Sequence, residues 1–183
     1  MRLLILTAAC LLFSHAVHAE PMQAGLWEVT SKMKSDDGEM EKAMAQAQAA
    51  MKNMPPEQRK MMQEMMAKQG VNMSMGADGS TTVKLCISEE MARRNQLPAQ
   101  QTGDCKTEMA PRAGNTQSMS YACSKPVSSG TGVYTWNGGS AYTFKMDIVN
   151  GSGSQTQKIQ ITGNGKWLAD DCGGIKPIST GQN

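Results

Sequence analysis

Apolar and polar residues alternate in short stretches over most of the chain, and this two-residue period is typical of half-buried β-strands. In residues 26–33 the alternation places Trp27, Val29 and Met33 on one face. In residues 142–148 it places four apolar residues on one face and three polar residues on the other. Further strands with this pattern are predicted at residues 81–87, 132–136 and 158–162.

Glycine and asparagine clusters separate these stretches and predict tight turns. Asn137-Gly138-Gly139-Ser140 and residues 150–154 each join two predicted strands. Gly163-Asn164-Gly165-Lys166 is interpreted as another turn, because it lacks the rest of the phosphate-loop pattern. The pattern therefore predicts a mainly β fold, with an antiparallel meander curled into an open barrel or a sandwich.

Residues 39–70 follow a helical period instead. Pro55-Pro56 divides this segment, since proline ends one helix and fits the first turn of the next, and Gly70 is placed as a C-cap. The segment is predicted to be a methionine-rich helical hairpin inserted between the first two strands. A shorter helix is predicted over residues 89–93 with Ser88 as its N-cap. The apolar stripes of the hairpin are Met40, Met44, Ala47, Met51 and Met54, then Met61, Met62, Met65 and Met66.

Residues 1–19 have the features of a secretory signal peptide. A basic start at Arg2 precedes an apolar run over residues 3–13, and small residues lead to a cleavage point after Ala19. The apolar run is too short to span a membrane. We therefore expect residues 20–183 to form a single disulfide-linked β domain in the periplasm, with no transmembrane segment.

Removal of the signal peptide changes the chemistry available to the chain, because Cys10 and both histidines, His15 and His18, lie within it. Cys10 could carry a lipid anchor, but Thr7 stands where the lipobox has leucine, so we interpret Cys10 as part of the signal's apolar core. Without histidine, neither a Ser-His-Asp nor a Cys-His arrangement can form. The exported chain is expected to be non-enzymatic.

The four remaining cysteines predict two disulfides in an exported chain. The turn at Gly114 lies midway between Cys105 and Cys123, so a hairpin centred there would place these two cysteines opposite each other. That pairing leaves Cys86 with Cys172. A four-cysteine zinc site would need closely spaced pairs such as C-x-x-C, which this sequence does not have.

Composition and charge narrow the possible partners. The chain has 17 methionines but only two phenylalanines, so methionine supplies much of the apolar surface that packing requires. The formal net charge of +2 gives no electrostatic case for a nucleic acid or an anionic membrane as partner. No cofactor is expected.

Several segments together resemble the exported bacterial family catalogued as domain of unknown function 3617. The resemblance implies a Gram-negative periplasmic or envelope protein that uses its paired cysteines structurally, and it implies no activity. The segments that carry it are Gly25-Leu26-Trp27-Glu28-Val29-Thr30, Pro55-Pro56-Glu57-Gln58-Arg59, Gly70-Val71, Lys84-Leu85-Cys86-Ile87-Ser88, Asp104-Cys105 and Asp171-Cys172-Gly173.

Three functional hypotheses follow. The first is a binding protein that holds a small apolar ligand, a lipid or a polypeptide under the helical hairpin as a lid. The second is Cu(I) binding, since thioethers are soft ligands, through Met61, Met62, Met65 and Met66. The third is a structural envelope protein whose methionine face meets a partner. Alternatively, methionine replaces leucine in the packing between the two helices and against the sheet. The candidate ligand or partner face is Met40, Met44, Met51, Met61, Met62, Met65 and Met66.

Overall fold

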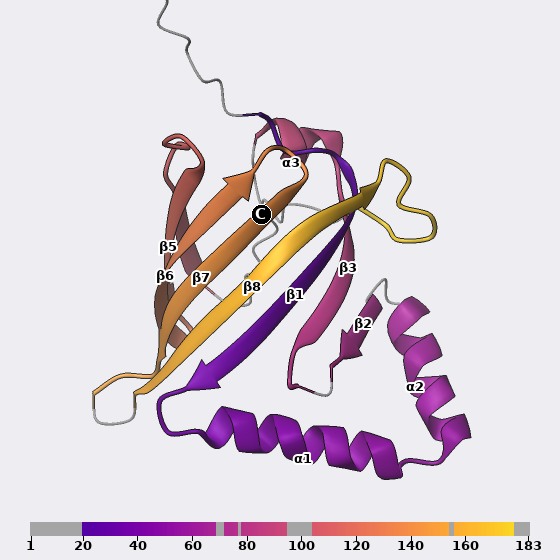
Figure 1. The fold of residues 1–183 in the computed structure, drawn as a ribbon. Coiled ribbons are helices and arrows are strands. Elements are labelled where there is room, and N and C mark those ends of the chain that lie inside the picture. The colour runs from indigo at the N-terminus through magenta and orange to yellow at the C-terminus, as the bar shows by residue number, and fades with distance from the viewer. Residues whose placement is uncertain (1–19, 69–71, 77, 95–103, 154–155, 178–183) are drawn as a thin grey trace, which may run out of the picture.

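The computed structural model describes residues 20–68, 72–76, 78–94, 104–153 and 156–177 (Figure 1). The predicted signal peptide, Cys10 and the C-cap predicted at Gly70 lie outside the described residues. The elements are β1 (Gly25–Ser35), α1 (Glu39–Asn53), α2 (Pro56–Lys68), β2 (Asn72–Met75), β3 (Thr81–Ile87), α3 (Glu89–Arg93), β4 (Cys105–Met109), β5 (Thr116–Ser124), β6 (Val127–Asn137), β7 (Ala141–Asn150) and β8 (Gln157–Ala169).

The strands form one eight-stranded antiparallel sheet in the order β2-β3-β1-β8-β7-β6-β5-β4. The sheet is strongly twisted and remains open, with β2 and β4 as its edges (Figure 1). From β4 to β8 each strand pairs with the next along the chain, which is the predicted meander. β1 pairs with β8, so the first and the last described strands lie next to each other inside the sheet. The prediction of a mainly β, open antiparallel fold is confirmed.

Two details of the strands differ from prediction. β2 was not predicted, and it pairs with β3 at the edge of the sheet. The turn predicted at Gly163-Asn164-Gly165-Lys166 is wrong, because these residues continue β8. A Cβ atom at Gly163 would collide with the ring of Phe144 on β7, and one at Gly165 would collide with the ring of Tyr142. The glycines therefore make room for aromatic rings of the neighbouring strand and do not mark a change of direction.

The core lies on one face of the sheet around Trp27, whose side chain is completely buried. The ring of Tyr142 lies 5.6 Å from that of Trp27 and 5.1 Å from that of Trp136, measured between ring centroids. α3 covers one end of this cluster through buried Met91. The predicted N-cap of α3 is confirmed, since Ser88 Oγ accepts a hydrogen bond from the backbone N–H of Met91 at 3.2 Å.

Two disulfides link parts of the sheet. Cys105 on β4 is bonded to Cys123 on β5, and these two residues are directly opposite in the strand register. Cys86 on β3 is bonded to Cys172, which follows β8. The pairing agrees with that favoured by the turn at Gly114.

α1 and α2 lie at the end of the sheet away from α3, and they form an open corner (Figure 1). The predicted division at Pro55-Pro56 is confirmed, since α1 ends at Asn53 and α2 begins at Pro56. Arg59 holds the corner by donating hydrogen bonds from Nη2 to the carbonyl oxygens of Lys52 and Met54. The two helices therefore do not pack along their lengths (Figure 1), and a methionine seam between them is not part of the described structure.

Candidate functional site

Strand pairing brings polar residues from six strands into one row across the sheet. The row begins on edge strand β4 and crosses β5, β6, β7 and β8 to reach β1. Because directly paired residues point to the same face, their side chains form a continuous polar strip. The members of this row are Glu108, Ser120, Thr131, Asp147, Gln160 and Lys34.

A second row runs parallel to the first, two residues along each strand, and so it shares the same face. Its members are Lys106, Ala122, Ser129, Val149 and Lys158. The row between the two points to the opposite face of the sheet. Its members are Tyr121, Gly130, Ile148, Ile159 and Ser35.

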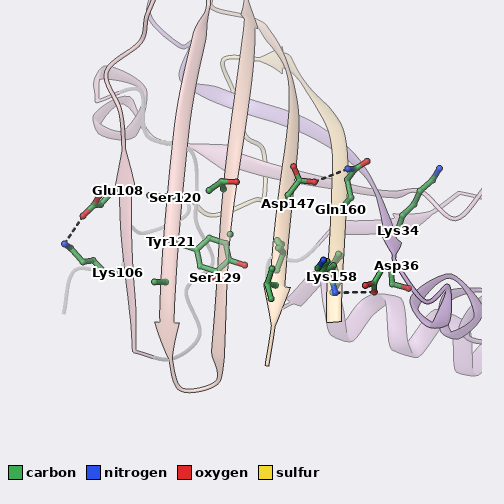
Figure 2. A pocket seen from close by; sticks show the side chains of 17 residues that line it. Lys34, Asp36, Lys106, Glu108, Ser120, Tyr121, Ser129, Asp147, Lys158 and Gln160 are labelled. Atoms are coloured by element: carbon green, nitrogen blue, oxygen red, sulfur yellow. Dashed lines mark hydrogen bonds and ion pairs between the residues drawn. The ribbon is translucent and has the colours of Figure 1, made fainter. Parts of the chain in front are cut away.

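These three rows, with Asp36, line a cavity of about 750 Å³ (Figure 2), which we call the cross-strand groove. It runs across the strands, and its volume lies within the range usual for small-molecule sites. Ala122 on β5 and Val149 on β7 give the groove apolar side chains between its two ends. Lys106 and Glu108 lie at one end, and Lys34 and Lys158 lie at the other (Figure 2). The groove therefore combines an apolar centre with charged ends.

Most of the charges along the groove already have partners. Lys106 Nζ lies 2.8 Å from Glu108 Oε1 at the β4 end, and this contact lowers the pKa of the Glu108 carboxyl and raises that of Lys106. The Asp147 carboxylate accepts a hydrogen bond from Gln160 Nε2 at 3.0 Å. Asp36 Oδ1 accepts one from the backbone N–H of Lys158 at 3.3 Å.

Two cations remain at the other end of the groove. Among the described residues, neither Lys34 on β1 nor Lys158 on β8 has its ammonium group in an ion pair. They lie on neighbouring strands, next to the end of β1 (Figure 2). This end of the groove therefore presents positive charge that is available to a ligand.

The methionines predicted as a ligand or partner face lie outside the groove, and neither helix contributes to its lining. α1 is linked to the lining through Ser35, whose Oγ accepts a hydrogen bond from the backbone N–H of Met40 at 3.1 Å. The carboxylate of Glu41 accepts hydrogen bonds from the N–H and Oγ of the same serine. On the described helices Met40, Met44, Met51 and Met62 are half-buried, Met61 and Met65 are exposed, and the side chain of Met66 is outside the described part. The predicted face is therefore divided between two helices that diverge.

The half-buried side of α1 faces the sheet, as its helical period predicts, but no side chain of α1 is fully buried. Gln48 on this side donates a hydrogen bond from Nε2 to the carbonyl oxygen of Gly76 at 2.7 Å. α1 is thus held to the turn between β2 and β3 by a polar contact as well as by half-buried methionines such as Met44 and Met51.

Sequence reasoning did not find the residues of the groove. The alternation marks the polar face of β7, including Asp147, but it does not show which residues of other strands lie beside it. Asp147 meets Thr131 and Gln160 only through the register of three strands. A paired-strand alignment anchored at the predicted turns is the one signal in the sequence that could have placed these rows together.

Within the described residues, no three His, Cys, Asp or Glu side chains are grouped so that they could hold a metal ion. No helix in the same part of the chain is long and apolar enough to cross a membrane.

The fold and the groove define the class as a disulfide-linked, mainly antiparallel β protein with a cavity across its strands. The chain belongs to the family described as protein of unknown function (DUF3617), which it matches over residues 22–172. A relative from Pseudomonas putida, described as an uncharacterized protein in the lpd-3 5' region, is 36% identical over 135 residues, or 73% of this chain and 92% of the relative. No solved structure matches the chain. The family resemblance is confirmed, and neither match carries an activity.

Proposed function

We propose that the protein is a non-enzymatic periplasmic binding protein that holds an amphiphile with an anionic head group in the cross-strand groove. The observation that carries this proposal is the cavity of about 750 Å³ with Lys34 and Lys158 at one end. This proposal keeps the lipid-like ligand of the first hypothesis from the sequence. It places the binding site on the sheet instead of beneath the helices.

The apolar centre of the groove favours an alkyl chain. Ala122 and Val149 stand side by side across β6, with only the small Ser129 between them. An alkyl chain along this row would remove apolar surface from water, at roughly 25 cal/mol per Å². Because the rows cross the strands, such a chain would lie across the sheet.

The charges favour an anionic head group over a cationic one. The carboxylates of Glu108 and Asp147 are occupied by protein partners, whereas the ammonium groups of Lys34 and Lys158 are not. A carboxylate or phosphate at either lysine would gain charge-assisted hydrogen bonds without breaking a contact that exists in the protein.

The compartment is supported by two independent features. Two disulfides indicate that the protein folds where thiols are oxidised. The signal-peptide pattern of residues 1–19 is the second feature, and it points to export. An amphiphile-binding protein in this location would carry or sequester molecules of the envelope.

The test is calorimetric titration of the oxidised protein with laurate below its critical micelle concentration. Ala122→Trp places a large ring in the groove and should weaken laurate binding by at least about tenfold. The matched control is Thr135→Trp, which adds the same ring at an exposed position on the same face outside the lining. Thr135→Trp should leave affinity unchanged.

Charge is tested separately with dodecyltrimethylammonium, which has an alkyl chain of nearly the same length and a cationic head. The wild-type protein should bind laurate in preference, and Lys34→Gln combined with Lys158→Gln should remove that preference. Absence of laurate binding, or equal binding of both amphiphiles by the wild-type protein, would refute the proposal.

The exposed Met61 and Met65 favour Cu(I) binding as a second candidate function, because they lie one helical turn apart on α2. Replacing Met61, Met62, Met65 and Met66 by leucine keeps an apolar face that a protein partner could use but removes the thioethers. Cu(I) affinity, measured by competition with a chelator, should fall in this variant. An unchanged affinity would exclude these methionines as ligands.

A further inference from the structure

The largest exposed apolar side chains near α2 are methionines. In the described chain, Met61 is 62% exposed, Met65 is 60% exposed and Met73 is 44% exposed. Met61 and Met65 lie on α2, and Met73 lies on β2, the edge strand that α2 contacts. We call these three residues the methionine patch.

Packing does not explain the methionine patch. Methionines that serve the core are nearly inaccessible, since Met22, Met91 and Met119 are 4%, 2% and 7% exposed. An exposed methionine does not gain the free energy that burial of an apolar side chain provides. A polar residue would suit the solvent face of α2 better. What distinguishes these side chains from other exposed apolar groups is an accessible sulfur.

The position of the patch isolates it from the structures that hold the fold. Figure 1 shows α2 beside β2 at the edge of the molecule, away from the core around Trp27. Both disulfides lie outside α2 and β2. A chemical change at Met61 or Met65 would therefore alter solvent-exposed surface and leave the core contacts intact.

We propose that the methionine patch is an oxidant-reactive site at which Met61, Met65 and Met73 reduce hydrogen peroxide and become methionine sulfoxide. The thioether sulfur attacks one peroxide oxygen, so that an S–O bond forms as the O–O bond breaks. The released hydroxide takes the proton from the transferred oxygen and becomes water. The sulfur loses two electrons and the peroxide gains them.

Sulfoxide formation is tolerated at this site for a physical reason. Oxidation converts an apolar side chain into a polar one, which disrupts a packed core but is well solvated on a surface. The three sulfurs can therefore consume oxidant while the disulfide-linked sheet remains folded. This inference is independent of the cross-strand groove, to which none of the three residues contributes.

The test treats the full oxidised protein with hydrogen peroxide and follows each methionine by peptide mass spectrometry. Met61, Met65 and Met73 should oxidise about tenfold or more faster than Met22, Met91 and Met119, since reaction follows exposure. The thermal unfolding midpoint should stay unchanged after the first three sulfoxides form. Similar rates at all six positions, or unfolding on their formation, would overturn the proposal.

Matched variants separate this site from the methionine content of the whole chain. Met61→Leu with Met65→Leu and Met73→Leu should slow peroxide consumption severalfold. The control removes the same number of sulfurs from the half-buried side of α1, as Met40→Leu with Met44→Leu and Met51→Leu, and should have a smaller effect. Equal slowing by both triple variants would refute a distinct site.

Discussion

At the scale of single residues, the aromatic core depends on glycines in the adjacent strand. Gly165 on β8 is directly paired with Tyr142 on β7, and the phenol ring of Tyr142 occupies the space where a Cβ atom of residue 165 would lie. The ring in turn contacts Trp27 and Trp136. A residue that looks like a turn former is therefore required here by close packing inside a strand.

We expect Gly165→Ala to destabilise the protein by about 3 kcal/mol or more, because the added methyl group must displace the Tyr142 ring from the core. Gly174→Ala is the control, since a Cβ atom at Gly174 would meet nothing within 4 Å. Urea unfolding of both variants measures the difference. Equal stability of the two variants would show that the ring of Tyr142 can move without cost.

A second prediction at this scale concerns alkaline pH. Burial raises the pKa of Tyr134 from 10.0 to about 12, and its hydroxyl donates a hydrogen bond to Met119 Sδ at 3.4 Å. Because the pKa is higher in the folded state, the contribution to stability is complete below pH 10 and is lost as pH rises toward 12. Each such group lowers the unfolding free energy by about 1.4 kcal/mol per pH unit in that window.

Tyr134→Phe should therefore lose less stability than the wild-type protein between pH 10 and pH 12, although it begins from a lower value at pH 8. Some slope should remain in the variant, since burial also raises the pKa of Tyr142. Urea unfolding at several pH values provides the measurement. Parallel curves for the two proteins would contradict the assignment of the slope to Tyr134.

At the scale of elements, the two disulfides should differ in their contribution to stability. They close segments of 18 and 86 residues, so chain entropy predicts about 3 kcal/mol for Cys105–Cys123 and about 4.5 kcal/mol for Cys86–Cys172. Paired replacement by alanine, measured by denaturant unfolding, should therefore destabilise more at Cys86 and Cys172. The reverse order would show that local strand pairing matters more than loop length.

The strands could be predicted from the sequence wherever one face is apolar. In β7 Tyr142 belongs to the core cluster and the alternating Phe144 and Met146 pack against it, as expected. β2 escaped prediction because four residues with two methionines give too short a pattern to separate from the helical segment before it. β8 was predicted too short, since its glycines are explained only by aromatic rings on another strand.

The groove could not be predicted because it depends on register among six strands. Ser120, Asp147 and Lys34 are far apart in sequence, and each looks like an ordinary solvated residue on a strand. The helix methionines attracted attention because their spacing is visible within a single element. The sequence thus locates sites built on one helix more readily than sites built across a sheet.

At the scale of the whole molecule, the structure separates three regions that sequence reasoning joined. The aromatic core and the disulfides hold the sheet, the cross-strand groove lies over its central strands, and the helices carry exposed methionines at the end beyond β1. The contact between Glu41 and Ser35 is a direct link between the helices and the lining of the groove. Binding in the groove and chemistry on the helices are therefore expected to be separable.

Replacing residues 42–68 by a flexible Gly/Ser linker tests this separation. The variant keeps Glu41, so the contact with Ser35 can persist. We expect both disulfides to form, unfolding to remain cooperative and laurate affinity to change by no more than about threefold, because every lining residue lies outside the deleted segment. In the intact protein, hydrogen exchange should be faster in α1 and α2 than in β7, since α1 buries no side chain.

The other outcomes of this deletion each identify a different role for the helices. A folded variant that no longer binds laurate would mean that they form the lid that the sequence suggested, and the groove proposal would fail. A variant that does not fold would mean that half-buried methionines such as Met44 and Met51 are part of the core, with α1 needed to close the end of the sheet. Retention of both folding and binding is expected, because the residues that form the buried core cluster and those that line the groove lie outside residues 42–68.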